Sequence, residues 1–219
     1  MVTKRDIKII QTIKKKKPNI QIETYSHTDA IEHSITYRAN GVDPTFMKPF
    51  NADFRNALYR FYGSIGGSKS PIKNRLDQLP LLNETLSQIY PFAHLWIDYK
   101  IIDSIYNFMP YNEFVKQSAL CEVYVDIART KLSEGFSFRI AEALFLNRKI
   151  LTNRTCLINE PFYDPNRIFI IGKDSPRRLK SFLESDLPPL PENILRMYDS
   201  SLWWTNKDPY KLECSEPIR

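Results

Sequence analysis

From about residue 55 onward, short apolar runs alternate along the chain with segments of helical periodicity. Short apolar, β-branched runs are typical of buried strands, whereas apolar residues recurring every three or four positions indicate helices. The pattern predicts strands at residues 57–63, 93–97, 120–127, 149–152 and 168–171, and helices at residues 81–89, 111–118, 138–146 and 177–184. Such alternation predicts an α/β fold with a mostly parallel, doubly wound, Rossmann-like sheet that binds ligands at the carboxyl ends of its strands.

The first fifty residues and the last thirty are less regular. A helix is predicted at residues 3–17, where isoleucines recur at helical spacing and a lysine run ends before Pro18. Ser26 and Asp29 have the spacing of a capping box that begins a second, short helix. Further predictions are a strand at 20–25, extended chain at 35–38, turns at 40–41 and 43–44, and a last helix at 192–204.

Composition and charge narrow the classes of protein. The 219 residues are 42% hydrophobic, enough for one large domain with a core, or for a domain plus a fragment of another. The formal net charge is +6, and residues 1–50 carry nine Lys or Arg against five Asp or Glu. A dedicated DNA-binding protein usually shows a broader basic face, and a local basic patch of this kind fits an anionic membrane surface or an anionic substrate equally well.

Cysteine number and hydropathy bear on location. Three widely spaced cysteines, at positions 121, 156 and 214, indicate neither a disulfide framework nor a zinc site. No apolar run reaches the ~18–20 residues of a transmembrane helix, and the N-terminus lacks a signal peptide's apolar segment. We therefore expect a cytoplasmic protein that is either soluble or peripheral to a membrane.

The most informative segment is residues 134–142, with the sequence EGFSFRIAE. It follows a predicted strand that ends near Asp126 and a polar loop, and it leads into a predicted helix. A helix N-terminus at the edge of a parallel sheet presents unpaired N–H groups and a partial positive charge, and a glycine there lets a ligand approach the backbone. The segment therefore predicts a diphosphate site at the amides of Phe136, Ser137 and Phe138, directly after Gly135.

The helix predicted at residues 138–146 is almost entirely apolar. Only Arg139 and Glu142 are polar within it, so most of its sides should be buried. A buried carboxylate at position 142 requires a partner. Two interpretations remain open: a pair with Arg139 at i, i+3 spacing, or a bound ligand.

Glu134 and Glu142 also carry a family resemblance. Two glutamates at this separation, with glycine and an aromatic residue after the first and alanine after the second, resemble the E-x7-E motif of GT-B-fold glycosyltransferases, especially family 4. The stretch 134–153 is similar to bacterial enzymes that build lipopolysaccharide or capsular polysaccharide. The chain contains no Asp-x-Asp sequence, the motif with which the other large glycosyltransferase fold usually holds a metal ion.

The resemblance implies transfer of a sugar, without a metal ion or other cofactor and with retention of configuration, from a nucleotide sugar to a glycan or lipid-linked acceptor. It also implies a location in the cytoplasm, with peripheral contact at the inner membrane. It assigns Glu134 to the sugar hydroxyls, Glu142 to the ribose, and the amides of residues 135–138 to the diphosphate. Basic side chains of a loop near the first strand of the domain would help neutralise the phosphates; the candidates are Lys69, Lys73 and Arg75.

The resemblance also divides the chain. Residues 1–50 would be a remnant of an N-terminal acceptor domain with its linker, residues 51–190 the nucleotide-sugar-binding domain, and residues 191–219 a C-terminal helix and tail. Because most of the acceptor domain would be absent, a truncated, non-catalytic nucleotide-sugar-binding remnant is the first alternative. A basic α/β module that binds nucleic acid, suggested by the pI of 9.1, is less favoured, and no nucleic acid is expected as a partner.

Overall fold

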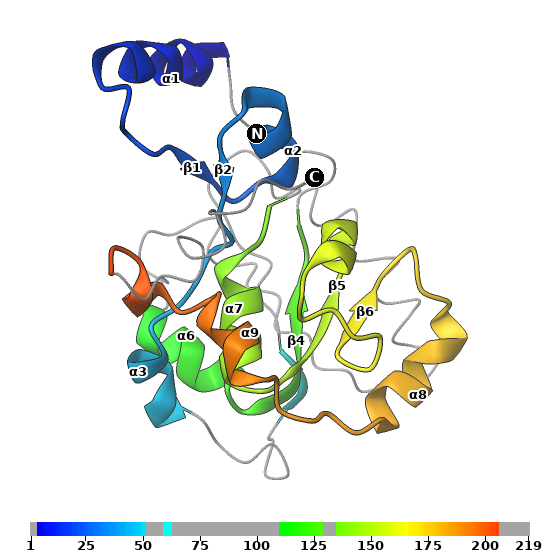
Figure 1. Ribbon diagram of the computed structural model, residues 1–219. Coiled ribbons are helices and arrows are strands. Elements are labelled where there is room, and N and C mark those ends of the chain that lie inside the picture. The colour runs from blue at the N-terminus through cyan, green and yellow to red at the C-terminus, as the bar shows by residue number, and fades with distance from the viewer. Residues whose placement is uncertain (1–3, 51–58, 63–109, 129–134, 206–219) are drawn as a thin grey trace, which may run out of the picture.

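A parallel sheet forms the centre of the protein (Figure 1), whose computed structural model describes residues 4–50, 59–62, 110–128 and 135–205. Among these residues the sheet has four strands in the order β3-β4-β5-β6, namely Tyr59–Tyr62, Cys121–Asp126, Lys149–Thr152 and Ile168–Ile170. Its principal helices are α6 (Tyr111–Ser118), α7 (Phe138–Phe145), α8 (Leu179–Glu184) and α9 (Glu192–Arg196). The predicted α/β class with a parallel sheet is confirmed. The strand predicted at 93–97 and the helix predicted at 81–89 lie outside the described residues.

Helices cover both faces of this sheet because strand side chains alternate between two apolar clusters. In β4, Tyr124 packs in one cluster with residues of α6, α7 and α9, such as Ile140 of α7. Its neighbours Val123 and Val125 point the other way and pack with Phe182 of α8. A strand buried on both faces reads as a continuous apolar run, which is why this segment was recognisable in the sequence.

The register of the sheet sets the carboxyl ends of its strands side by side. The Cα of Asp126 pairs with that of Thr152, and Thr152 pairs in turn with Ile170. Asp126 therefore closes β4 at the edge of the sheet where ligands bind in open α/β folds. The chain returns from this edge into α7.

The N-terminal elements are short apart from the first helix. They are α1 (Lys4–Lys16), β1 (Glu23–Thr24), α2 (His27–His33), β2 (Thr36–Tyr37) and α3 (Pro44–Met47). The predicted cap of α2 is confirmed, because the amide of Asp29 donates to Ser26 Oγ at 3.2 Å. The turn predicted at 43–44 begins α3, where Asp43 Oδ1 accepts from the amide of Thr45 at 2.8 Å. Within the described chain no helix is long and apolar enough to cross a bilayer.

Residues after β2 join the core of the larger sheet. Val42 and Met47 are buried in the same cluster as Phe136 and Tyr198. The amide of Val42 donates to the carbonyl of Tyr198 at 3.0 Å. This contact explains why the single helix predicted at 192–204 was wrong. Helix α9 ends at Arg196, and the backbone of residues 198–200 pairs with that of Val42. A 3₁₀ turn, Ser200–Leu202, follows before the described chain ends at residue 205.

A buried carboxylate makes a second link between the N-terminal segment and the sheet domain. Glu160 accepts hydrogen bonds from the hydroxyls of Tyr37 at 2.5 Å and Tyr198 at 2.9 Å. Its Oε1 also lies 3.1 Å from Nε2 of His27, whose ring stacks on that of Tyr37. A buried charge that is hydrogen-bonded from several sides holds its partners in one arrangement.

Candidate functional site

Asp126, at the carboxyl end of β4, is the centre of a charged network. Its Oδ2 lies 2.6 Å from Nε of Arg154, which follows β5, and its Oδ1 lies 3.5 Å from a guanidinium nitrogen of Arg139 on α7. Arg154 also donates to the carbonyl of Gly135, just before α7. One carboxylate therefore connects the ends of two strands to the start of the helix.

The two arginines keep Asp126 ionised although it is buried. Burial alone would raise the pKa of this carboxyl, but the positive charges of Arg154 and Arg139 outweigh burial and hold the pKa below its usual value. The hydroxyl of Ser137 lies close enough to favour the ionised form without completing a hydrogen bond. The network is thus a fixed negative charge compensated by two cations.

Glu142 lies on α7 with only 1% of its surface exposed. Its Oε1 accepts a hydrogen bond of 2.7 Å from the hydroxyl of Tyr111, the first residue of α6. Its Oε2 is buried and has no hydrogen-bond partner among the residues that the structure describes. The carboxylate is therefore anchored through Oε1, while Oε2 remains an acceptor without a described donor.

Burial, together with the negative charge of Asp126, raises the pKa of Glu142 above its usual value, while Tyr111 and Arg139 partly offset this effect. The same carboxylate and burial raise the pKa of the Tyr111 hydroxyl, which stays protonated and donates. Of the two interpretations left open by the sequence, the i, i+3 pair is not formed, because Arg139 extends to Asp126 instead. Oε1 of Glu142 is held by Tyr111 without a ligand. Oε2 is a buried acceptor without a described partner, and buried polar atoms are usually hydrogen-bonded, so Oε2 is a candidate to bind a ligand.

The backbone before α7 is partly occupied by the N-terminal segment. The amide of Phe136 donates to the carbonyl of Tyr25 at 3.3 Å, and its carbonyl accepts from the side chain of Asn40. The amides of Gly135, Ser137 and Phe138 have no acceptor among the described residues. Ser137 is the N-cap of the helix but makes no side-chain capping bond, and the ring of Phe138 is exposed.

Gly135 is required for contact with Tyr25. A Cβ at this position would lie 2.3 Å from Cδ2 of the Tyr25 ring, closer than atoms can approach. We expect Gly135→Ala to lower the free energy of unfolding by about 1–3 kcal/mol, as measured by urea denaturation, because the added methyl overpacks this contact. Tyr25→Ser in the same chain should recover most of that loss. No recovery would show that the glycine serves another purpose.

The structure brings together some of the residues singled out in the sequence. Gly135, Phe136, Ser137, Phe138 and Glu142 surround the start of α7. The other four, Glu134, Lys69, Lys73 and Arg75, lie outside the described residues. The sequence pattern indicated no role for Asp126, Arg154 or Tyr111. Asp126 could have been found, because it is a charged residue directly after the apolar run Val123 to Val125. Nothing in the local sequence marks Arg154 or Tyr111.

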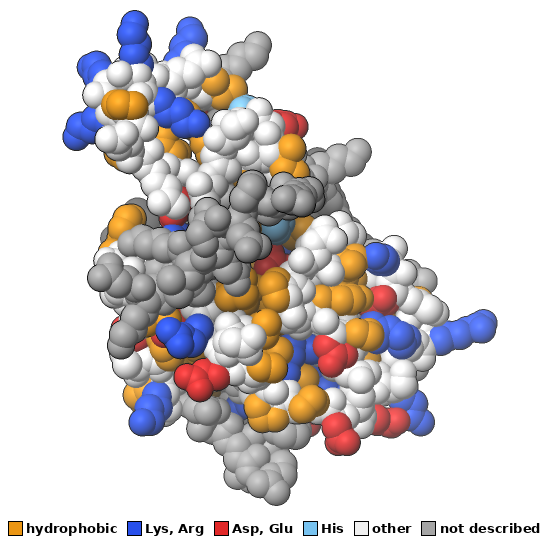
Figure 2. All heavy atoms as spheres, viewed as in Figure 1, with side chains coloured by type: hydrophobic (Ala, Val, Ile, Leu, Met, Phe, Trp, Pro, Cys, Tyr) orange, Lys and Arg blue, Asp and Glu red, His pale blue; other side chains and the backbone are white. Residues whose placement is uncertain are grey.

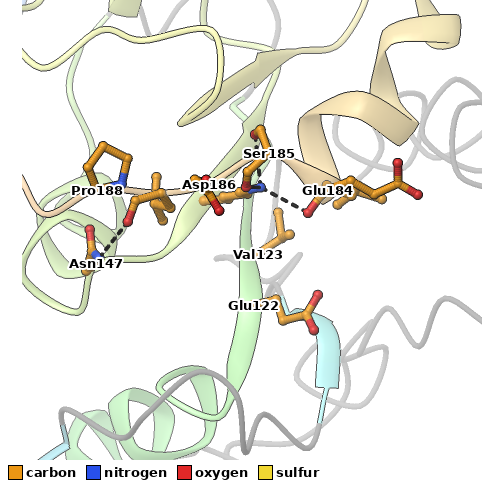
Figure 3. Close-up of a pocket in the computed structure, with 10 residues that line it drawn as sticks. Glu122, Val123, Asn147, Glu184, Ser185, Asp186 and Pro188 are labelled. Carbon is orange, nitrogen blue, oxygen red and sulfur yellow. Dashed lines mark hydrogen bonds between the residues drawn. The ribbon is translucent and has the colours of Figure 1, made fainter.

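A pocket of about 490 Å³ lies away from this site (Figure 3). It adjoins Val123 and Lys149, near the opposite ends of β4 and β5, and three carboxylates line it: Glu122, Glu184 and Asp186. Lys149 Nζ donates to the carbonyls of Phe182, Leu183 and Ser185, so its charge serves to cap the C-terminus of α8. The pocket is therefore poorly suited to a diphosphate, because it is lined by carboxylates and the ammonium group of Lys149 already binds backbone carbonyls.

No protein-family model, curated protein or solved structure matches this chain. Support for a function therefore comes from the geometry around α7 and from the motif of residues 134–142.

Proposed function

We propose that the chain is the donor-binding half of a metal-independent GT-B glycosyltransferase, and that it binds a nucleotide sugar at the N-terminal end of α7. The observation that carries the proposal is the carboxylate of Glu142, which is buried, anchored by Tyr111 through one oxygen, and without a described partner on the other. A buried acceptor of this kind suits a ribose, because ribose hydroxyls donate hydrogen bonds.

The residues around Glu142 also supply positive charge that would complement the phosphates of a nucleoside diphosphate. The helix N-terminus contributes a partial positive charge, and the amides of Gly135, Ser137 and Phe138 are donors that no described residue uses. The amide of Phe136 already donates to the carbonyl of Tyr25, so it is not one of the amides that would bind the diphosphate, contrary to the sequence-based expectation. Arg139 is partly exposed and lies beside both carboxylates, where it would balance charge when a phosphate approaches.

The implied reaction is transfer of a glycosyl group to a hydroxyl of a surface polysaccharide or its lipid-linked precursor, in the cytoplasm. Charge develops on the departing diphosphate and on an oxocarbenium-like sugar, so helix N–H groups and basic side chains would stabilise the transition state in place of a metal ion. Glu134 would contact the sugar, and Lys69, Lys73 and Arg75 the phosphates.

A ligand screen on the full chain tests this proposal. We expect at least one of UDP, GDP, ADP and CMP, or a sugar derivative of one, to raise the melting temperature. At about 100 times Kd, a single site adds about 2.7 kcal/mol, which corresponds to about 5–10 °C for a domain of this size. Inorganic pyrophosphate is the control for binding of anions alone.

Two results would contradict the proposal. One is the absence of a shift with every nucleotide and nucleotide sugar. The other is an equal shift with pyrophosphate, since a simple anion site needs no buried acceptor at position 142. Release of nucleoside diphosphate in the presence of a glycan acceptor would then distinguish a transferase from a protein that only binds the donor.

A further inference from the structure

Helix α1 lies apart from the four-stranded sheet, at the far end of the N-terminal segment (Figure 1). It contacts the other described residues lightly: Ile7, Ile10 and Ile13 are half-buried, and Lys14 Nζ donates to the carbonyl of Ser34 at 3.1 Å. Thirteen residues are a marginal length for an isolated helix in water. A helix with so little packing is a candidate for contact with a partner.

The positive charge of the protein is concentrated on and directly after this helix. Residues 4–17 contain seven Lys or Arg and one Asp, a net charge of +6, which equals the formal net charge of the whole chain. The remaining residues contain 24 Lys or Arg and 24 Asp or Glu, and so carry no net charge. Figure 2 shows these basic side chains projecting around α1. The net positive charge of the protein is therefore located at one end of the molecule.

The same end of the molecule exposes apolar side chains. Ile9 on α1 is 47% exposed, Ile20 just after it 43%, and Ile31 on α2 81%. On α1 itself, helical spacing places Ile9, Ile10 and Ile13 on one side and the exposed Lys8 and Lys15 on the other. An amphipathic helix with a cationic polar face, flanked by further exposed isoleucines, has the composition of a helix that lies in the plane of a bilayer interface.

We propose that α1, with the exposed isoleucines beside it, docks the protein onto the surface of a bilayer that contains anionic phospholipid. The lysines contact headgroup phosphates, while Ile9 and the isoleucines near it enter the boundary between headgroups and acyl chains. Charge complementarity alone would also fit a polyphosphate or RNA. The exposed isoleucines favour a membrane, because a polyanion in water offers them no apolar surface. This inference is independent of the function proposed for the α7 site.

Flotation of the full chain with vesicles tests the proposal. Vesicles of phosphatidylcholine with about one third phosphatidylglycerol should bind the protein, whereas pure phosphatidylcholine should not. The variant Lys8→Gln/Lys15→Gln/Lys16→Gln should bind about 100-fold more weakly, since each lysine near an anionic surface contributes roughly a five-fold factor. Ile9→Ser should weaken binding about ten-fold through lost burial in the interface.

The matched control removes three exposed cations from another part of the chain. Lys173→Gln/Arg177→Gln/Lys180→Gln has the same change in net charge and should keep binding within a few-fold of the unsubstituted protein. Three results would overturn the proposal: binding that does not depend on phosphatidylglycerol, equal losses in the two triple variants, or binding to polyphosphate that matches binding to vesicles and is unaffected by Ile9→Ser. Circular dichroism of each variant confirms that it is folded.

Discussion

Replacing Arg154 with alanine is expected to lower the free energy of unfolding by about 3–5 kcal/mol, because it breaks a buried ion pair and leaves the charge of its partner behind. Asp126 has a side chain that is only 2% exposed, and Arg154 Nε is its nearest cation at 2.6 Å. Arg139, at 3.5 Å, remains but cannot replace the lost hydrogen bond. The carbonyl of Gly135 would lose its donor as well.

Urea denaturation at neutral pH measures this loss. Arg177→Ala, which removes an exposed arginine, should change stability by no more than about 0.5 kcal/mol. Asp126→Asn in the Arg154→Ala background removes the stranded charge and should recover part of the loss. A loss below about 1 kcal/mol, or no recovery in the double variant, would contradict a charge-paired role for Arg154.

The same pair gives the protein an acid-sensitive contribution to stability. Because the folded pKa of Asp126 is below its ordinary value of 3.8, its ionised form stabilises the fold above that pH. This contribution is lost as the pH falls through the folded pKa. In Arg154→Ala the depression of the pKa should be reduced, so the loss of stability as the pH falls below 3.8 should become smaller.

Glu142→Gln is expected to weaken binding of the nucleotide ligand about 10–100-fold while leaving the fold as stable as before or more stable at neutral pH. The amide oxygen can still accept from Tyr111, now 2.7 Å from Oε1, so the anchor is kept. The variant no longer buries a charge, which explains the expected gain in stability. A ribose hydroxyl loses a charged acceptor, and a hydrogen bond to a charged group contributes about 1.5–3 kcal/mol.

Titration calorimetry with the best ligand from the screen measures the binding loss, and Glu192→Gln, on an exposed residue, is the control. The pH dependence provides a second observable. Since the folded pKa of Glu142 is raised, its contribution to stability is present at low pH and is lost as pH rises from 4.5 through the folded pKa. Glu142→Gln should remove that fall. Reduced stability at neutral pH with unchanged binding would mean that the carboxylate is structural.

Local periodicity sufficed to predict the elements that carry this site. The helix at 111–118 and the strand at 149–152 have the predicted bounds, and α7 differs by one residue at its end. These segments are buried in a sheet with helices on both faces, so the hydrophobic pattern records their packing directly. The strand predicted at 20–25 and the extended chain predicted at 35–38 contain strands of two residues each. Among the described residues, β1 and β2 pair with each other and not with the larger sheet, so no further strand extends them.

The partners within the site could not be predicted, because they are set by tertiary distance. Arg139 and Glu142 are neighbours on one helix, yet Asp126, at the end of β4, takes the arginine and Tyr111 takes the glutamate. Gly135 has the residue type of a phosphate loop, but its space is used by Tyr25, which is 110 positions earlier in the chain. In both cases the residue types indicated a site, and the fold determined which groups remain available to a ligand.

The pairing of Val42 with Tyr198 and Asp199 has a consequence for synthesis of the protein. Residue 199 follows residue 42 by 157 positions, so at about 5–20 residues per second the ribosome delivers it roughly 8–30 s later. Until then Val42 and Met47 have no Tyr198 to pack against, and the nascent chain exposes them. The folding of this N-terminal segment is therefore delayed until residue 199 has been synthesised. During that delay a chaperone would be needed most.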